Sequence, residues 1–196
     1  VAVNRQESPW LQPGEYVKPP ASIPMTWFNL KPRTPGCNLP PWDTVMLRRW
    51  QSDDRQRVAV LIAEVLAEYG LGWEPDGADR DVIEVEAFYG DRGGEFWVME
   101  AAGTIVGTGA FYAIDRQPNA CEIRKMYLQA EIRGWGLGRQ LLQWLEQRAI
   151  AQGFQEAWIE TASVLTEAVR LYESAGYQPS MGVETARCDR VYRKSL

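Results

Sequence analysis

The sequence predicts one α/β domain built on a mixed sheet and preceded by a proline-rich arm. Three observations lead to this prediction. Hydrophobic residues make up 45% and charged residues 24% of the 196 residues, which is typical of a single globular domain. Strand-like and helix-like segments follow one another in the order β-α-α-β-β-β-α-β-α-β. One helix follows a glycine-rich turn, and the strands that it connects should run parallel.

The arm is expected to span residues 1–43 and the domain residues 44–196. Nine of the 12 prolines fall between Pro9 and Pro41, in a segment without helical or strand periodicity. The arm also carries Trp27 and Phe28, and bulky aromatic side chains are unfavourable in water. We therefore expect the arm to pack on its own domain or on a second subunit of a homodimer. A disordered leader and a proline-rich signalling ligand are the alternatives.

The first half of the domain is predicted as one strand, two helices and a hairpin. Residues 45–49 form the strand, and Ser52 begins a run of N-cap residues before the first helix. The apolar stripe of that helix consists of Val58, Leu61, Ile62, Val65, Leu66 and Tyr69, and Gly70 ends it. A second helix is expected over residues 80–89. Residues 95–101 and 104–114 then form two strands around a tight turn.

The second half alternates strands and helices. Residues 121–128 form a strand, and a helix over residues 137–152 ends at Gly153. A strand at residues 157–161, a helix at residues 166–175 and a closing strand at residues 191–194 complete the predicted sheet.

The chain contains no histidine. This excludes Ser-His-Asp and Cys-His nucleophiles and imidazole-based metal sites, so no metal is expected. Cys37, Cys121 and Cys188 are odd in number and widely spaced, which fits neither a disulfide framework nor a Cys-x-x-Cys site. No apolar stretch approaches the ~20 residues of a membrane span. We expect a cytoplasmic protein without a membrane partner.

The segment from Arg133 to Arg139, with the sequence RGWGLGR, lies between a predicted strand and a helix start. Backbone N–H groups and the helix dipole can hold phosphate oxygens there. A dinucleotide fingerprint would need a third glycine at Arg139, and the Gly-Lys-Ser/Thr of a nucleoside-triphosphate loop is also missing. The segment from Arg124 to Arg139 contains four basic side chains and one acidic side chain, whereas the domain as a whole is acidic. One small basic turn suits a phosphate-bearing ligand but not nucleic acid.

Together, three segments resemble the GNAT superfamily of N-acetyltransferases. They are the strand EIRKMYL at residues 122–128, the RGWGLG turn, and the pattern Ala168-x-x-Leu171-Tyr172-x-x-x-Gly176-Tyr177. The resemblance implies a mostly antiparallel central sheet flanked by helices and splayed between its fourth and fifth predicted strands. It also implies acetyl-coenzyme A in the notch between those strands, with its pyrophosphate on the turn. The implied cofactor-binding residues are Met126, Tyr127, Leu128, Arg133, Gly134, Trp135, Gly136, Leu137, Gly138 and Arg139.

Acyl transfer from a thioester to an amine needs a base, oxyanion donors and an acid for the leaving thiolate. By the resemblance, Glu122 matches a catalytic carboxylate and Tyr172 matches the tyrosine that protonates the thiolate. A salt bridge of Glu122 with a neighbouring basic residue and a purely structural Tyr172 are the alternatives. Glu160 is a weaker candidate for the base. Cys121 is a poor nucleophile, because a neighbouring carboxylate raises the pKa of a thiol.

The resemblance also implies that the second helix and its loops wall the acceptor side of the notch, and Glu84, Phe88 and Tyr89 are the candidate substrate residues there. Residues 74–100 carry nine acidic side chains against two basic ones. Such a surface would attract a cationic small amine or a peptide amine. The alternative is that these acids form a solvated outer face.

Two functions follow from the sequence. The first is transfer of an acetyl group from acetyl-coenzyme A to a primary amine by direct attack in a ternary complex. The second is a non-catalytic acyl-coenzyme A binding or sensing module whose N-terminal arm contacts a partner.

Overall fold

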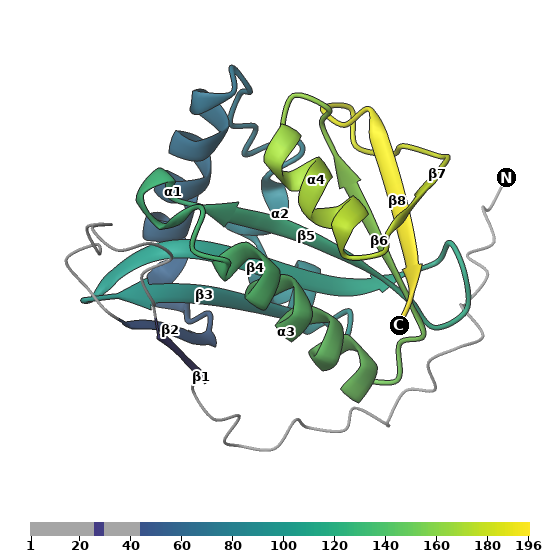
Figure 1. The fold of residues 1–196 in the computed structure, drawn as a ribbon, viewed down its shortest axis with the longest axis horizontal. Helices are drawn as coiled ribbons and strands as arrows, with labels where there is room; N and C mark the ends of the chain where they lie inside the picture. The colour runs from purple at the N-terminus through teal and green to yellow at the C-terminus, as the bar shows by residue number, and fades with distance from the viewer. Residues whose placement is uncertain (1–25, 30–43) are drawn as a thin grey trace, which may run out of the picture.

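A computed structural model describes residues 26–29 and 44–196 of the chain. These residues form a sheet in the order β1-β2-β3-β4-β5-β6-β8-β7, with helices on both of its faces (Figure 1). The strands are β1 (Thr26–Asn29), β2 (Thr44–Arg49), β3 (Glu95–Ala101), β4 (Thr104–Ile114), β5 (Ala120–Leu128), β6 (Glu156–Thr161), β7 (Gln178–Ser180) and β8 (Arg190–Ser195). The helices are α1 (Arg55–Glu68), α2 (Arg80–Ile83), α3 (Leu137–Ala151) and α4 (Thr166–Ser174). All paired strands are antiparallel except β5 and β6, which confirms the predicted mixed, mostly antiparallel sheet.

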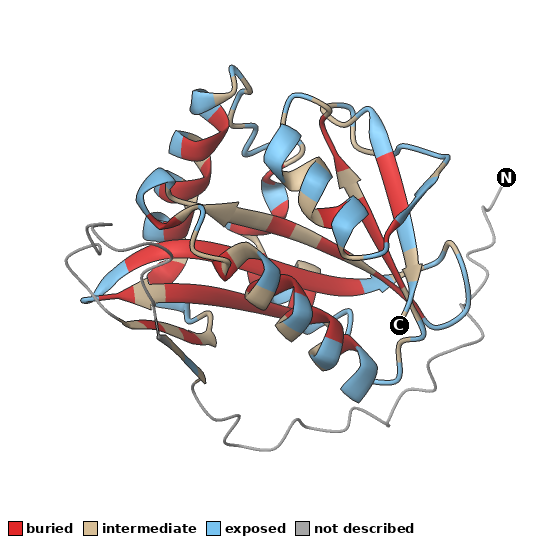
Figure 2. Ribbon diagram, viewed as in Figure 1, coloured by how far each residue is buried: buried red, intermediate tan, exposed pale blue. Residues whose placement is uncertain are grey.

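Side chains alternate between two cores on opposite faces of the sheet. In β3, Phe96 and Val98 belong to the core that α1 and α2 cover, whereas Trp97 and Met99 belong to the core under α3. Buried residues run along the central strands and the inward faces of the helices, and the outer faces of the helices are exposed (Figure 2). The sheet is therefore the middle layer of the domain, with helices on both sides.

The sheet opens between β5 and β6. These strands pair at only three positions, from Ala120 with Glu156 to Glu122 with Trp158. Beyond Glu122 the strands separate, while β5 stays paired with β4 as far as Leu128. The predicted splay between the fourth and fifth predicted strands is confirmed.

Several predicted elements agree closely with the structure. The hairpin of β3 and β4 turns through Ala102 and Gly103, whose φ angles of 46° and 79° are those of a tight left-handed turn. Helix α3 begins at Leu137 as predicted and ends at Ala151. Its start is fixed by Gly136, which takes a φ of 85° at the N-cap.

The continuous helix predicted over residues 80–89 is wrong. Helix α2 stops after four residues, Glu84 breaks it, and a π-helical turn follows at Glu86–Gly90. The break turns Tyr89 into the core, where its hydroxyl donates to the carboxylate of Asp81 at 2.5 Å. This tertiary contact outweighs a local periodicity that fits an unbroken helix.

Two strands were not predicted. β1 lies inside the proline-rich arm and pairs antiparallel with β2, and its four residues are too few to show a strand periodicity. β7 contains Pro179, which an edge strand tolerates because a proline has no N–H to donate. The rest of the arm lies outside the described residues. The domain boundary at residue 44 stays a prediction, although β1 shows that part of the arm joins the sheet.

Candidate active site

A cavity of about 500 Å³, which we call the notch, opens where β5 and β6 separate. Residues 122–128 of β5 form one wall, and residues 160–162, 165, 167, 168, 171 and 172 of β6, α4 and their connection form the other. The end of α1 contributes Val65, Tyr69 and Leu71, the glycine-rich turn and α3 contribute Arg133, Gly134, Gly136, Gly138, Arg139 and Leu141, and the segment before β8 contributes Thr185, Arg187 and Cys188. The notch is therefore lined by residues from both the first and the second half of the domain.

A β-bulge shapes the β5 wall of the notch. The register with β4 shifts between Thr108 and Ala110, so β5 carries one extra residue there. Lys125 takes a φ of 55°, which is unusual for a residue with a side chain. The Thr108 hydroxyl donates to the Lys125 carbonyl at 2.7 Å and holds this conformation. The bulge changes the direction of the β5 backbone close to the point where β5 and β6 separate.

The glycine-rich turn presents the N-terminus of α3 to the notch. The first hydrogen bond along the helix runs from the Gln140 N–H to the Gly136 carbonyl at 3.1 Å, so the preceding N–H groups have no partner in the helix. A Cβ added at Gly138 would come within 3.4 Å of the Leu171 side chain, so the glycine keeps this end of the notch open. These N–H groups, together with the helix dipole, are suited to hold phosphate oxygens.

The structure brings most of the predicted cofactor-binding residues to the notch, but not Trp135 and Leu137. Leu137 is only 1% exposed and belongs to the core, and Trp135 packs against it. Arg133 donates to the Glu68 carboxylate at 2.5 and 3.0 Å, which ties the turn to the end of α1. Arg139 donates to the Ser174 hydroxyl at 2.7 Å.

Glu122 stands at the closed end of the notch. Its carboxylate accepts a hydrogen bond from the Tyr112 hydroxyl at 2.8 Å, and the Arg124 guanidinium lies 3.8 Å away. Burial raises the pKa of Glu122 above its ordinary value, although Arg124 and Tyr112 act in the opposite direction. A partly buried carboxylate with a raised pKa has the properties of a general base.

Tyr172 faces Glu122's strand from α4 and also lines the notch. Its side chain is 5% exposed. Burial raises the pKa of its hydroxyl, with smaller contributions from Tyr127 and Cys188. The hydroxyl therefore keeps its proton at neutral pH and can donate it.

Two other ionisable groups beside the notch are unsuited to catalysis. Glu160 accepts the backbone N–H groups of Glu184 and Thr185 at 2.9 and 2.8 Å and pairs with Arg116. These contacts outweigh its burial and hold the pKa of Glu160 below its ordinary value, so it is a weak base. Cys121 is fully buried, and burial raises the pKa of its thiol to about 12.

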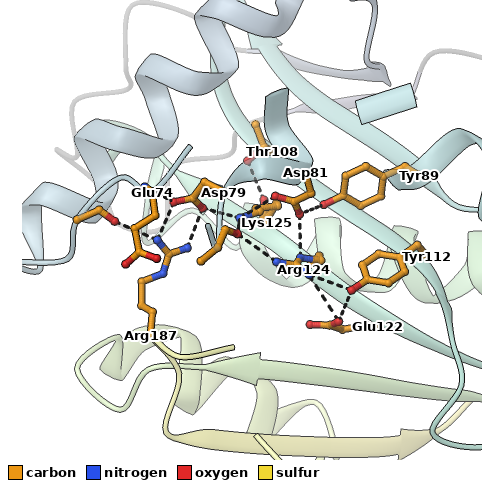
Figure 3. A network of polar contacts seen from close by, with 12 residues as sticks. Glu74, Asp79, Asp81, Tyr89, Thr108, Tyr112, Glu122, Arg124, Lys125 and Arg187 are labelled. Atoms are coloured by element: carbon orange, nitrogen blue, oxygen red, sulfur yellow. Dashed lines mark hydrogen bonds and ion pairs between the residues drawn. The ribbon is translucent and has the colours of Figure 1, made fainter. Parts of the chain in front are cut away.

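A buried network of ion pairs lies along the side of the notch near α2 (Figure 3). The Lys125 ammonium, 2% exposed, sits 2.5 Å from Asp79 and 3.1 Å from Asp81. Arg187 reaches from the segment before β8 and donates to both oxygens of Asp79 at 2.7 Å. Arg124 continues the network from Asp81 towards Glu122. The charges at this end of the notch therefore largely compensate one another.

The structure does not support the acidic acceptor surface expected from residues 74–100. Six of the nine acids are paired with basic side chains, namely Asp79, Asp81, Glu84, Glu86, Glu95 and Glu100. The candidate substrate residues also lie outside the notch: Glu84 pairs with Arg80, Phe88 packs under the Arg92 guanidinium, and Tyr89 is in the core. The break in the predicted helix contributes to this, because it turns Tyr89 into the core.

Sequence reasoning did not identify Arg187, Cys188, Asp79 and Tyr112 as neighbours of the site. Arg187 and Asp79 are 108 residues apart and lie in segments without periodicity, so no spacing in the sequence relates them. Tyr112 could have been found by pairing the predicted strands, because it lies directly opposite Glu122.

Within residues 26–29 and 44–196, no group of three or more His, Cys, Asp or Glu side chains could hold a metal ion. In the same part of the chain, no helix is long and apolar enough to cross a membrane.

Solved structures share this fold. An acetyltransferase of the GNAT family from Staphylococcus aureus Mu50 superposes with a TM-score of 0.72 at 19% identity, over 78% of this chain and 99% of that one. A GNAT superfamily phosphinothricin acetyltransferase from Sinorhizobium meliloti, solved in complex with AcCoA, gives a TM-score of 0.62 at 18% identity, over 78% and 88% of the two chains.

Sequence comparison extends the likeness beyond the fold. The uncharacterized N-acetyltransferase YjgM of Escherichia coli K12 is 35% identical over 144 residues, which cover 72% of this chain and 86% of that protein. An IAA acetyltransferase of Azospirillum brasilense is 35% identical over 82 residues, or 42% and 53% of the two chains. Residues 40–177 match the profile of the acetyltransferase (GNAT) family. With its splayed sheet and its glycine turn at the start of α3, the chain belongs to the GNAT family of acetyltransferases.

Proposed function

We propose that this protein transfers an acetyl group from acetyl-coenzyme A to a primary amine by direct attack in a ternary complex. One observation carries the proposal: a single cavity holds both a helix start with N–H groups that have no partner in the helix and a partly buried carboxylate whose pKa is raised. The first suits a phosphate-bearing thioester and the second suits deprotonation of an amine. We assign the activity to the domain of residues 44–196.

The residues present fit acetyl-coenzyme A as co-substrate. The N–H groups at Gly136, Leu137 and Gly138 would hold the pyrophosphate, supported by Arg139 at the mouth of the notch. The backbone at Met126, Tyr127 and Leu128, beyond the bulge, would bind the chain that carries the thioester. The acetyltransferase of Sinorhizobium meliloti, whose structure contains AcCoA, has the same fold and supports this assignment.

Three groups of this chain would do the chemistry. Glu122 takes the proton of the ammonium group, directly or through a water, and so releases the lone pair of the amine. Backbone N–H groups at the bulge stabilise the negative charge that develops on the thioester oxygen. Tyr172 gives its proton to the departing thiolate. Their opposite roles agree with their environments, since Glu122 can accept a proton and Tyr172 retains its own at neutral pH.

The acceptor is proposed to be a primary amine whose positive charge brings no large advantage. Five basic side chains line the notch, Arg124, Lys125, Arg133, Arg139 and Arg187, against three acidic ones, Glu122, Glu160 and Glu167. A polyamine would meet no strongly negative field there. In a series of amines of matched size, kcat/KM should not rise with positive charge and should depend weakly on salt.

Replacement of Glu122 by Gln tests the proposed base. Gln keeps the shape of the side chain but cannot accept the proton, so turnover should fall roughly 10²-fold, while the Kd for acetyl-coenzyme A changes little. Glu167→Gln is a matched control, because Glu167 lines the notch but its carboxylate accepts the Tyr69 hydroxyl at the mouth. Full activity of Glu122→Gln at neutral pH would show that another group is the base. A protein that binds acetyl-coenzyme A and acetylates no amine would instead support the sensing module.

A further inference from the structure

Tyr112 and Glu122 are direct partners across the antiparallel pair of β4 and β5. Side chains at such positions leave the same face of the sheet at close range. The Tyr112 hydroxyl donates to Oε2 of Glu122 at 2.8 Å, as Figure 3 shows. The Tyr112 side chain belongs to the core under α1 and α2 and is 9% exposed, so it has little freedom to leave this position.

Arg124 determines the direction of this hydrogen bond. Its Nη1 donates to the Tyr112 oxygen at 2.9 Å, and its Nε lies 3.0 Å from Oδ2 of Asp81. A guanidinium can donate but cannot accept. The Tyr112 oxygen therefore accepts from Arg124, and its own proton points to Glu122. A hydroxyl fixed in this way stabilises the ionised form of the carboxylate.

The Tyr112 ring is packed among charged and aromatic groups. The Arg124 and Arg92 guanidinium groups lie 5.6 and 5.5 Å from the ring centre, and the Tyr89 ring packs in a T-shaped arrangement with the two ring centres 5.7 Å apart. Tyr89 in turn donates to Asp81, which anchors Arg124. Tyr112, Arg124, Asp81 and Tyr89 therefore form a ring of mutual contacts, and the Tyr112 hydroxyl connects this ring to one oxygen of Glu122.

Other charged groups also face Glu122, and they balance one another. Glu160 lies across the notch on β6 and disfavours the ionised carboxylate, whereas Arg116, from the connection before β5, favours it. Cys188 faces it from the segment before β8 as a neutral thiol, because burial raises the pKa of Cys188 to about 11. Glu160 and Arg116 also pair with each other, which leaves Arg124 and Tyr112 as the groups that most strongly oppose the effect of burial on Glu122.

We propose that Tyr112, oriented by Arg124, is a positioning residue that fixes the Glu122 carboxylate and keeps it ionised within the buried end of the notch. Oε2 is held by Tyr112, and among the described residues no hydrogen bond is made to Oε1, which is therefore the oxygen that receives a proton. The expected effect of Tyr112 on turnover rests on the proposed function. The expected effect of Tyr112 on the ionisation of the Glu122 carboxyl group does not depend on that function.

The test is Tyr112→Phe, which removes the hydroxyl and keeps the ring. Loss of one hydrogen bond to a charged group should move the acidic limb of the kcat/KM profile upward by about one pH unit. Most of the activity should return on the alkaline side of the new limb. The matched control is Tyr192→Phe, which removes the hydroxyl of a buried tyrosine on β8 that donates to Glu173 of α4. Its pH profile should equal that of the parent.

A second measurement does not depend on turnover. The Glu122 carboxyl carbon, labelled with ¹³C and assigned by its absence in Glu122→Gln, should titrate about one pH unit higher in Tyr112→Phe than in the parent. An unchanged titration, or an equal loss of activity at every pH, would overturn the inference. If Glu122→Gln remained active, the proposed base would be wrong, and the ¹³C titration would still decide the role of Tyr112.

Discussion

Arg187 and Asp79 form a two-point ion pair that joins the segment before β8 to the segment before α2, with both N–O distances at 2.7 Å (Figure 3). The two segments belong to opposite sides of the notch. The Asp79 carboxylate has no exposed surface and also forms an ion pair with the Lys125 ammonium group. This pair therefore links the two halves of the domain across the opening in the sheet.

Asp79→Asn should destabilise the protein strongly. The change leaves Lys125 and Arg187 without their shared counter-charge, and breaking a buried ion pair in this way costs about 3–5 kcal/mol of the free energy of unfolding. Urea denaturation at neutral pH measures the loss. Asp76→Asn, an exposed acid of the same segment, is the control and should stay within about 0.5 kcal/mol of the parent.

The Asp79 carboxylate also predicts how the stability of the protein depends on pH. Burial alone would raise its pKa, but Arg187 and Lys125 outweigh burial and hold the pKa of Asp79 at about 2, below its ordinary value of 3.8. A carboxyl whose pKa is lower in the folded state adds stability above its ordinary pKa and loses it as the pH falls through the lower value. Between pH 4 and pH 2 the parent should lose roughly 2 kcal/mol that Asp79→Asn does not lose. Parallel curves for the two proteins would contradict this assignment.

Gly138→Val should weaken the binding of acetyl-coenzyme A and leave the domain folded. Position 138 does not need a left-handed φ, and the added side chain would approach Leu171 and close the phosphate end of the notch. Loss of charge-assisted hydrogen bonds predicts a Kd higher by about 10- to 100-fold in calorimetry. Gly90→Val, where an added Cβ meets no atom within 4 Å, is the control. Binding as tight as that of the parent would place the phosphates elsewhere.

Tyr172→Phe should lower kcat by roughly 10²-fold without a matching change in coenzyme affinity, because the leaving thiolate loses its proton donor. Tyr177→Phe is the matched control. It removes a neighbouring buried hydroxyl that has no hydrogen-bond partner among the described residues. If both variants turned over equally well, Tyr172 would have only a packing role.

Thr108→Val should impair the bulge of β5. Val has the shape of Thr but cannot donate to the Lys125 carbonyl, which would remain buried without that partner. We expect a loss of about 1–3 kcal/mol of stability and a lower kcat. Thr108→Ser restores the donor and should recover most of both. Failure of Ser to recover activity would show that the methyl group, not the hydroxyl, matters.

The parts of the fold that the sequence predicts well are those set by local patterning. The hairpin of β3 and β4 combines β-favouring residues with a turn at Ala102-Gly103, and α3 has both a glycine start and an apolar stripe. Local pattern and tertiary structure agree there. At residues 80–89 they disagree, because the contact of Tyr89 with Asp81 breaks a helix that periodicity favours.

The candidate site was predictable where family resemblance and strand position coincide. Glu122 and Tyr172 were placed in this way, and both line the notch. The ion pair of Arg187 with Asp79 depends on how two irregular segments meet in space, and the pattern of charges along the chain does not contain that information. The contact between these two segments also pairs Asp79 with basic side chains, whereas a count of charges along the sequence includes Asp79 as an uncompensated acid.

The short pairing of β5 with β6 gives the sheet an edge in its interior. Beyond Glu122, the side of the β5 backbone that faces β6 offers main-chain donors and acceptors to the notch. Exposed edges of this kind normally recruit a further strand and promote aggregation. Here α1, α4 and the segment before β8 enclose the edge, so no second sheet can reach it. Under the proposed function, the amide groups of acetyl-coenzyme A would provide partners for these main-chain donors and acceptors.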